Sequence, residues 1–466
     1  MGQMPQPPDP ILEAMFELIK AGERRYKESL SPVLVSLTRP IQTMQDPLSL
    51  FHATQRVDSN RSYWALPAEQ TCIVTAGEAA VVRSEGSARF QRAVDLMREM
   101  TKSAVIDGSG SIGPAFVGGF RFDSETSVNG LWAPFGDGAL TLPRWMFSNR
   151  SDGRRFLTIN LVLGERTNIG SLRRQLSDEA AALFGSLSEL QSWGNSVKAE
   201  PVVDHWQSNV EEVLDAIKNR GLAKVTLARL MNLRSTELIL PELVLQSLQT
   251  NYPECHVFAF CRNGMCFLGA SPEELVSLHG NRVTSTCLAG SAPRGESETE
   301  DSQLSFQMLD SQKERREHAV VVEWISERME RLCSKLQWDE VPHVLRLGNV
   351  QHLATRFVGT PRDGFHVLSF AEALHPTPAV GGIPLQPALE LIKQLEEFDR
   401  GWYAGPVGWV DREGNGEFAI AIRCALLRGN EAYLYAGAGI VSGSDPERED
   451  QETMMKFKPL LTALNA

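Results

Sequence analysis

Two pairs of glutamates have a spacing that places carboxylates on one face of a helix. Glu314 and Glu317 lie in the helix-like stretch 313–318, and Glu449 and Glu452 repeat the spacing near the C-terminus. Like charges three residues apart are neighbours on a helix and destabilise it by about 0.2–0.5 kcal/mol per pair. Either pair alone is typical of a solvated helix face. Four carboxylates that converge from two helices would instead suit Mg²⁺, a hard cation that takes one or two direct carboxylates.

Lys224 and Glu273 are candidates for a general base and a general acid. Lys224 begins the apolar, strand-like run 224–228, where burial would lower the pKa of a lysine and leave a neutral amine able to act as a base. Glu273 follows another strand-like segment, where burial would raise its pKa. From the residues alone, a surface lysine and a glutamate at a helix start are the simpler interpretations.

A glycine-rich strand end and an arginine are candidates for binding an anion. Residues 436–441 read Ala-Gly-Ala-Gly-Ile-Val, and Gly437 and Gly439 let backbone N–H groups approach an anion closely. Arg423, on a predicted strand over 418–427, carries a planar guanidinium that suits a carboxylate. The alternatives are a tight strand exit and an exposed strand arginine.

The composition is that of a soluble globular protein, with 42% hydrophobic and 22% charged residues. The net charge of −12, without a Lys/Arg-rich stripe, is atypical of nucleic-acid binding. No apolar run reaches the roughly 18 residues of a spanning helix, and the start lacks a signal-peptide pattern. We therefore expect no nucleic-acid or membrane partner and a cytoplasmic location. Seven dispersed cysteines without a C-x-x-C pair indicate reduced thiols rather than disulfides or a zinc site.

The elements that must position these residues are helices and antiparallel strands. Four turn signals at hairpin spacing, at 263–264, 280–281, 411–416 and 429–430, separate apolar runs. This pattern predicts an α+β fold whose sheet is mostly antiparallel. The expected helices are 11–21, 90–101, 204–219 with Asp204 as N-cap, one from Pro241, 302–337, 386–398 and 447–464; the expected strands include 71–82, 156–163 and 224–229.

The domain organisation follows from the absence of an internal linker. Residues 1–10 carry four prolines and are expected to form a loose lead-in. We find no repeat, low-complexity tract or Pro/Gly/Ser linker that would mark a boundary further on. The sequence therefore predicts one domain over residues 11–464.

The chain contains, in this order, the segments 224–229, 271–273, 288–291, 313–318, 351–353, 375–378, 400–405, 421–423, 436–441 and 449–456. This series resembles that of the chorismate-utilising enzymes, and the resemblance is greatest to the isochorismate synthase branch of that family. It is strongest over residues 200–464 and weaker over about 50–200. The resemblance implies a single α+β domain in which two large antiparallel sheets face each other with helices outside.

The resemblance also implies a reaction and roles for the polar residues. Water adds at C2 of the chorismate ring and the C4 hydroxyl leaves, with Mg²⁺ holding the ring carboxylate. Lys224 matches the base that activates water, and Glu273 matches the acid that protonates the departing hydroxyl. The metal ligands implied are Glu317 and Glu452, which bind directly, and Glu314 and Glu449, which bind through water. The substrate-binding residues implied are Arg423, Lys456, Gly290, Gly437, Gly439, Thr377 and Tyr403.

Three alternatives within the resemblance differ in their sequences. Branches that use ammonia lack the lysine base and have a different loop at 380–384, so water is expected as nucleophile and no glutaminase subunit is expected. Salicylate synthases share Lys224 and Glu273 but eliminate pyruvate, which makes them the second interpretation. A catalytically silent binding subunit is disfavoured because every expected catalytic position is filled. The resemblance implies a monomer and leaves open whether the product enters menaquinone, siderophore or salicylate synthesis.

Overall fold

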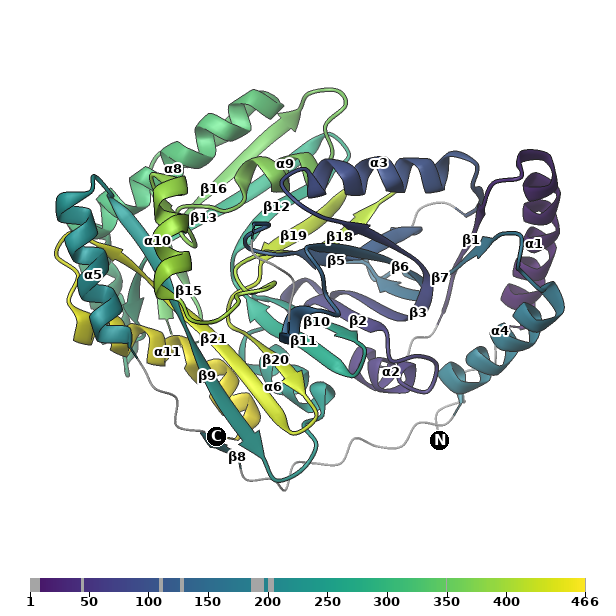
Figure 1. Ribbon diagram of the computed structural model, residues 1–466, viewed down its shortest axis with the longest axis horizontal. Helices are drawn as coiled ribbons and strands as arrows, with labels where there is room; N and C mark the ends of the chain where they lie inside the picture. Colours follow the sequence, from purple (N-terminus) through teal and green to yellow (C-terminus); the bar gives the residue numbers. More distant parts are fainter. Residues whose placement is uncertain are drawn as a thin grey trace.

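The computed structural model describes residues 9–42, 46–108, 112–125, 130–185, 197–199, 205–348 and 350–465. In this part of the chain, helices cover a large, mostly antiparallel system of strands (Figure 1). The helices are α1 (Asp9–Ser29), α2 (Pro47–Thr54), α3 (Arg89–Lys102), α4 (Ile169–Phe184), α5 (Trp206–Asn219), α6 (Pro241–Asn251), α7 (Glu298–Asp310), α8 (Gln312–Leu332), α9 (Val367–Leu374), α10 (Leu385–Leu395) and α11 (Pro446–Leu464). The strands are β1 (Val33–Pro40), β2 (Arg61–Leu66), β3 (Thr71–Ser84), β4 (Val105–Asp107), β5 (Ala115–Phe120), β6 (Gly138–Asn149), β7 (Arg155–Leu163), β8 (Val197–Ala199), β9 (Lys224–Ser235), β10 (His256–Arg262), β11 (Met265–Ser271), β12 (Glu274–His279), β13 (Arg282–Pro293), β14 (Cys333–Trp338), β15 (His343–Arg346), β16 (Val350–Pro361), β17 (Gly382–Ile383), β18 (Pro406–Asp411), β19 (Gly416–Ile420), β20 (Cys424–Arg428) and β21 (Glu431–Val441).

A long ribbon of β3 and β6 connects two sheets. The two strands pair along their length, with an irregular register between Glu78 and Ala80. From β6 one sheet continues through β5, β18, β19, β12 and β13 to β16. From β3 the other continues through β2, β10, β11, β20 and β21 to β9, and β7, β1 and β4 extend it beyond β6. Among the described pairings only β1–β4 is parallel, so the predicted antiparallel character is confirmed.

Two hydrophobic clusters lie on opposite faces of the strands. On β10, Phe258 and Phe260 belong to the cluster that also contains Phe418 of the other sheet. Their neighbours Val257 and Ala259 belong to the second cluster, beneath α1, α2, α4, α6 and α11. This division follows from the strand geometry, because successive side chains point to opposite faces. Each fully buried phenylalanine contributes about 1.5–3 kcal/mol through the apolar surface that it removes from water.

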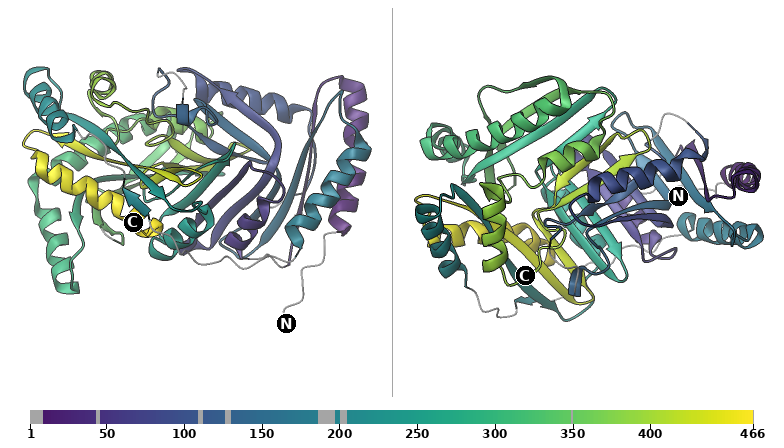
Figure 2. Two further views of the ribbon diagram at one scale, coloured as in Figure 1. Left: turned by 60° about the horizontal axis from the view of Figure 1, so that its bottom comes forward. Right: turned by 45° about the horizontal axis from the view of Figure 1, so that its top comes forward.

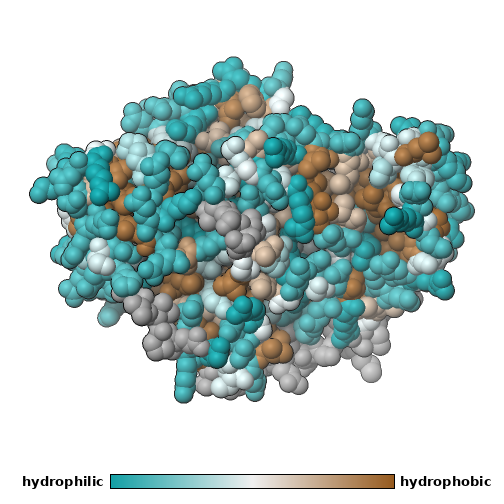
Figure 3. All heavy atoms as spheres, in the orientation of Figure 1, coloured by the Kyte–Doolittle hydropathy of each residue, from teal (hydrophilic) through white to brown (hydrophobic). Residues whose placement is uncertain are grey.

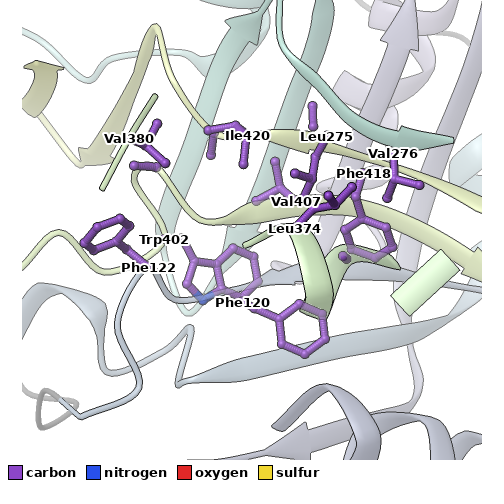
Figure 4. Packing of buried hydrophobic residues seen from close by; sticks show 14 of the residues in the cluster. Phe120, Phe122, Leu275, Val276, Leu374, Val380, Trp402, Val407, Phe418 and Ile420 are labelled. Atoms are coloured by element: carbon purple, nitrogen blue, oxygen red, sulfur yellow. The ribbon is translucent and has the colours of Figure 1, made fainter. Parts of the chain in front are cut away.

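The cluster that contains Phe258, Phe260 and Phe418 supports the segment that precedes β18. The ring of Trp402 lies 5.2 Å from that of Phe135 and 5.8 Å from that of Phe260, both in edge-on contact. Figure 4 shows Phe122 and Val380 at one end of the part of the cluster that it draws, with Trp402 between Phe122 and Phe120. This packing fixes the backbone at Trp402. The next residue, Tyr403, is a candidate for substrate binding.

The helices cover the outside of both sheets. α1 and α4 lie side by side at one end of the molecule, as all views in Figures 1 and 2 show. At the other end α8 packs on β13 and β16, and α11 packs along β21 and against α5 and α6. In the described part of the chain no helix is both long and apolar enough to cross a membrane. Hydrophilic side chains cover most of the face in Figure 3, with apolar ones in separate patches.

Most of the predicted elements are present. The four predicted turns connect the hairpins β10–β11, β12–β13, β18–β19 and β20–β21. The prediction of one helix over 302–337 is wrong in two respects. This stretch is broken into α7 and α8, because the hydroxyl of Ser311 accepts a hydrogen bond from the backbone N–H of Glu314 and caps α8. Its last residues instead form β14, whose pairing with β16 satisfies their backbone groups.

Two smaller corrections concern element ends. The lead-in predicted over 1–10 is too long, because α1 begins at Asp9 and a proline is favourable in a first helical turn. The helix predicted over 386–398 ends at Leu395, because the backbone of Glu396 is extended. Residues 1–8 and the predicted cap Asp204 lie outside the described residues.

Candidate active site

Ten of the predicted site residues line one cavity. Its walls come from β9, β13, β16, β21, α8 and α11, and from connecting segments after β11, after α9 and on both sides of the β18–β19 hairpin. These elements are distant in sequence, and the pairing of β9 with β21 brings two of them side by side (Figure 1). The ten residues are Lys224, Glu273, Gly290, Glu317, Tyr403, Arg423, Gly437, Gly439, Glu452 and Lys456.

Lys224 begins β9 and is buried, with 5% of its surface exposed. Its Nζ donates a 2.6 Å hydrogen bond to Oε1 of Glu317 on α8. A Cβ on Gly439 would lie 2.7 Å from Cε of Lys224 and 3.5 Å from Oε1 of Glu317. The glycine therefore makes room for the lysine in addition to exposing its own backbone.

Glu273 lies in the connection between β11 and β12 and is buried. Burial raises the pKa of Glu273 to about 7, although the positive charges of Lys224, Arg423 and Lys456 act in the opposite direction. The hydroxyl of Ser271 accepts a hydrogen bond from the backbone N–H of Glu273, which fixes the turn. This glutamate can hold a proton below neutral pH while it faces three cationic side chains.

Arg423 does not lie within a strand, in contrast to the prediction. The predicted strand 418–427 is two strands, β19 and β20, and Arg423 stands between them in the left-handed region with φ of +50°. Such a backbone costs on the order of 1–3 kcal/mol for a residue other than glycine and tends to occur at functional sites. Burial lowers the pKa of Arg423, while the nearby Cys255 and Glu452 act to raise it. The connection thus directs a buried guanidinium into the cavity.

Lys456 reaches the cavity from α11. Its Nζ donates hydrogen bonds to the carbonyl oxygen of Gly437 at 2.7 Å and to Oε1 of Glu452 at 2.6 Å. The lysine therefore joins the last helix to β21. It places a second cation near Arg423, which suits an anionic ligand.

The two glutamate pairs approach from two helices. Burial raises the pKa of Glu314 on α8, and the negative charge of Glu317 adds to the effect. Burial raises the pKa of Glu449 on α11, and Glu452 adds in the same way. Burial also acts to raise the pKa of Glu452, but Lys456 outweighs it and holds that pKa below its usual value. A cation would relieve the repulsion between these carboxylates.

The donor atoms of this cluster fit Mg²⁺. In the described part of the chain no three His, Cys, Asp or Glu side chains converge closely enough to form a metal site by themselves. Glu317 and Glu452 instead pair with Lys224 and Lys456, each at 2.6 Å. Mg²⁺ prefers oxygen ligands and uses one or two protein carboxylates with water and substrate oxygens, so the chemistry of the cluster is suitable. The assignment of direct ligands remains a prediction.

Three predicted residues do not line the cavity. Oε2 of Glu314 lies behind the wall, 2.9 Å from the position that a Cβ would take on Gly290, whose φ is +80°. Glu449 is buried beside the cavity wall on α11. Thr377 is buried in a turn, where its carbonyl oxygen accepts a hydrogen bond from the N–H of Val380. Thr377 thus shapes the segment that lines the cavity without reaching the cavity itself.

His352 is a cavity residue to which the sequence assigned no role. Burial lowers the pKa of His352 to about 3, and the positive charges of Arg423 and Lys456 add to the effect, so the imidazole is neutral. Its Nδ1 lies 3.1 Å from both the hydroxyl of Ser291 and the carbonyl oxygen of Gly290. The sequence did contain a signal for this residue, because His352 lies in 351–353, one of the segments that carry the family resemblance.

Tyr435 is a second residue that sequence reasoning missed. On β21, Tyr435, Gly437 and Gly439 share the face toward the cavity because strand side chains alternate. The ring of Tyr435 stacks on that of Tyr403, with centroids 5.1 Å apart and planes at 18°. A Cβ on Gly437 would lie 2.9 Å from the hydroxyl oxygen of Tyr403. One large residue followed by two glycines therefore forms a wall and leaves room beside it for Tyr403 and Lys224.

Comparison with known proteins identifies the family. The model of the family described as "Chorismate binding enzyme" matches residues 18–465. The chain belongs to this family of chorismate-binding enzymes. The predicted resemblance and the prediction of an enzyme are thereby confirmed.

Relatives of this chorismate-binding enzyme share most of its length. It is 34% identical to the isochorismate synthase MenF of Bacillus subtilis over 94% of this chain and 95% of the relative. It is also 34% identical to the salicylate biosynthesis isochorismate synthase of Pseudomonas aeruginosa, over 98% of this chain and 96% of the relative. The structure of the menaquinone-specific isochorismate synthase of Escherichia coli has a TM-score of 0.79 at 26% identity and covers 96% of this chain and 99% of its own. Anthranilate synthase component I of Streptococcus pneumoniae shares the fold, with a TM-score of 0.66 at 20% identity over 84% of this chain and 92% of its own. The predicted fold class is confirmed.

Proposed function

We propose that this enzyme is an isochorismate synthase, which converts chorismate into isochorismate by adding water at C2 and releasing the C4 hydroxyl. The observation that carries the proposal is the common cavity of Lys224 and Glu273, with Arg423 and Lys456 beside them. Relatives named isochorismate synthases over nearly the full chain support it. The reaction makes one C–O bond at C2, shifts the ring double bonds and breaks the C–O bond at C4.

The cationic side chains of the cavity account for binding. Chorismate carries two carboxylates, and Arg423 and Lys456 suit one of them as charge-assisted hydrogen-bond donors. Tyr403 and the backbone at Gly437 border the same space. The second carboxylate is the one assigned to the proposed Mg²⁺. Holding the substrate at both carboxylates orients the ring before the reaction and removes much of the entropic cost of bringing the groups together.

Lys224 and Glu273 account for the proton transfers. Lys224, as a neutral amine, takes a proton from water as its oxygen bonds to C2. Glu273, as a protonated carboxyl, donates its proton to the oxygen leaving C4. The pKa of Glu273, raised to about 7 by burial, supports its role as acid. The lysine must leave its ion pair with Glu317 to act as a base.

Mg²⁺ is the proposed cofactor. Glu317 and Glu452 would bind it directly, and Glu314 and Glu449 would do so through water. When bound, the ion supplies positive charge that orients and polarises a substrate carboxylate. The surrounding carboxylates, two of which have pKa values raised by burial and by the charge of a neighbouring glutamate, support this assignment.

The remaining proposals concern the setting of the enzyme. We propose a cytoplasmic monomer that works without a glutaminase subunit and forms one domain, predicted over residues 11–464 and extended by α1 to Asp9. The sequence at 380–384, which differs from that of the ammonia-using branches, supports the last point. Sedimentation of the purified enzyme tests the monomer. The relatives' names include menaquinone and salicylate synthesis, and the product is compatible with either.

Product analysis tests the proposal. Purified enzyme incubated with chorismate and Mg²⁺ is expected to yield isochorismate, resolved from chorismate by chromatography. Salicylate and pyruvate formed without an added lyase would instead identify a salicylate synthase. EDTA is expected to stop turnover and added Mg²⁺ to restore it, whereas a chain that binds chorismate without converting it would be a binding subunit.

A further inference from the structure

A buried ion pair behind the cavity contacts three of the cavity's walls. Arg400 and Glu396 have side chains only 5% and 4% exposed. Nε and Nη2 of Arg400 donate to the two carboxylate oxygens of Glu396 at 2.7 and 2.5 Å. Neither residue lines the cavity, so the pair is not a substrate ligand.

The first wall is β9, the strand that carries Lys224. One edge of β9 pairs with β21, whereas among the described residues the other edge pairs with β17 only at its start and with β8 only at its end. Between these points Nη2 of Arg400 donates to the carbonyl oxygen of Thr226 at 2.8 Å, and Oε1 of Glu396 accepts from the N–H of Ala228 at 2.7 Å. The ion pair thus supplies the donor and the acceptor that a neighbouring strand would otherwise provide.

The other two walls are the segments before β17 and before β18. Nη1 of Arg400 donates to the carbonyl oxygen of Val380 at 3.0 Å. The carbonyl oxygen of Arg400 accepts from the N–H of Tyr403 at 2.9 Å, and its guanidinium lies 5.8 Å from the tyrosine ring. One arginine is therefore hydrogen-bonded, through its guanidinium or its backbone carbonyl, to the segments that present Lys224, Val380 and Tyr403 to the cavity.

We propose that Arg400 and Glu396 are positioning residues, whose ion pair holds these three walls in the register that directs Lys224 at the substrate. The inference rests on the proposed function. Two well-packed apolar residues often stabilise a protein as well as a buried ion pair does, so stability alone does not explain this one. Its directional hydrogen bonds to two backbone positions of β9 explain it, because they fix the position of the strand that carries Lys224. A shift of about 1 Å at a reacting group can lower the rate about 100-fold.

The test uses two conservative variants of the full enzyme, Arg400→Lys and Glu396→Gln. The matched control is Arg234→Lys. Arg234 is an exposed arginine near the end of β9, and it pairs with Glu431. We expect kcat to fall 10- to 100-fold in both variants, with KM for chorismate within threefold of the wild-type value. Hydrogen exchange of a peptide that spans residues 222–232 is expected to accelerate, with Tm within a few degrees of the wild-type value. The control should match the wild type in every measurement.

Three outcomes would overturn the inference. The first is wild-type kcat, within twofold, in folded variants. The second is a proportional rise of KM, which would make the pair part of substrate binding. The third is loss of cooperative unfolding in both variants, which would make the pair structural. Wild-type enzyme that fails to convert chorismate would overturn the proposed function instead, and the exchange measurement would then decide the positioning role: faster exchange over 222–232 supports it, and unchanged exchange rejects it.

Discussion

At the scale of single residues, the proposed chemistry depends on two side chains in opposite protonation states. Glu273 is prepared for its role by burial, which raises its pKa to about 7. Lys224 is paired with Glu317, so its role depends on losing that partner when substrate and cofactor bind. The acid is therefore pre-formed by the fold, whereas the base depends on the ligands.

Replacing the proposed base tests the reaction directly. Lys224→Ala is expected to lower kcat by about 10²- to 10⁴-fold, the usual contribution of a general base. The circular dichroism spectrum and Mg²⁺ binding by calorimetry should remain close to those of the wild type. The control is Lys218→Ala, at an exposed position at the end of α5. Retained turnover in Lys224→Ala would remove the lysine from the mechanism.

The pKa of Glu273 predicts how activity depends on pH. The acid must carry a proton, so kcat/KM should fall about tenfold per pH unit as the pH rises above about 7. Glu273→Gln should lose activity at least 100-fold and lose this limb of the profile. A wild-type profile that is flat from pH 6 to pH 9 would contradict the assignment.

The same pKa also predicts an effect on stability. Because the pKa of Glu273 is higher in the fold than its usual value of 4.5, the native state binds this proton more tightly, and that stabilisation is lost as the pH rises through about 7. Above that pH the buried charge costs on the order of a few kcal/mol. Glu273→Gln should therefore have a higher Tm than the wild type at pH 8 and a similar Tm at pH 5, as calorimetry can measure.

At the scale of elements, the β9–β21 ribbon is the central feature of the site. β9 supplies Lys224, and β21 supplies the wall of Tyr435, Gly437 and Gly439. The register of the two strands decides which residue lies beside the lysine. A shift of one residue would turn the glycines to the other face and place Ala438 or Ile440, according to its direction, beside Lys224.

A substitution on this ribbon tests the arrangement. Gly439→Ala would place a methyl group 2.7 Å from Cε of Lys224, and the flexible end of the lysine would move aside. We expect kcat to fall at least tenfold while Tm changes by less than about 2 °C. Gly164→Ala is the matched control, since a Cβ there meets no atom within 4 Å. Equal activity of the two variants would show that the position of Lys224 is not critical.

At the scale of the whole molecule, two helices from distant parts of the chain border the cavity. α8 follows the acidic helix α7, and α11 closes the described chain, yet the charge of Glu452 on α11 adds to the burial that raises the pKa of Glu314 on α8. An ion held by both helices would bind the folded state and not the unfolded one. Binding should therefore stabilise the molecule by an amount that rises with the logarithm of the ion concentration once that concentration exceeds the dissociation constant.

Thermal unfolding with and without Mg²⁺ measures this effect. At a concentration about 100 times the dissociation constant, Mg²⁺ should add about 2.7 kcal/mol to the free energy of unfolding. The shift in Tm should disappear with EDTA and should be reduced in Glu317→Gln and Glu452→Gln. A Tm that does not depend on Mg²⁺ would contradict the proposed metal site, even if the enzyme were active.

The sequence by itself determined the kinds of element and the candidate residues. Asn263-Gly264 and Gly429-Asn430 specify hairpins, because glycine and asparagine accept the backbone conformations of tight turns. Lys224 and Glu273 were identified by their residue types and by matching segments. Helix α8 was predicted too long, because the alternation in Cys333–Trp338 becomes decisive only when β16 is available as a partner.

Only the tertiary structure decided which candidates share a cavity. It placed Gly439 beside Lys224, turned Arg423 inward through a left-handed backbone, and left Thr377 in a turn outside the cavity. It also added His352 and Tyr435, whose neighbours lie far away in sequence. The physical reason is that turns and helices depend on short stretches of chain, whereas burial, pKa shifts and side-chain neighbours depend on the register between strands hundreds of residues apart.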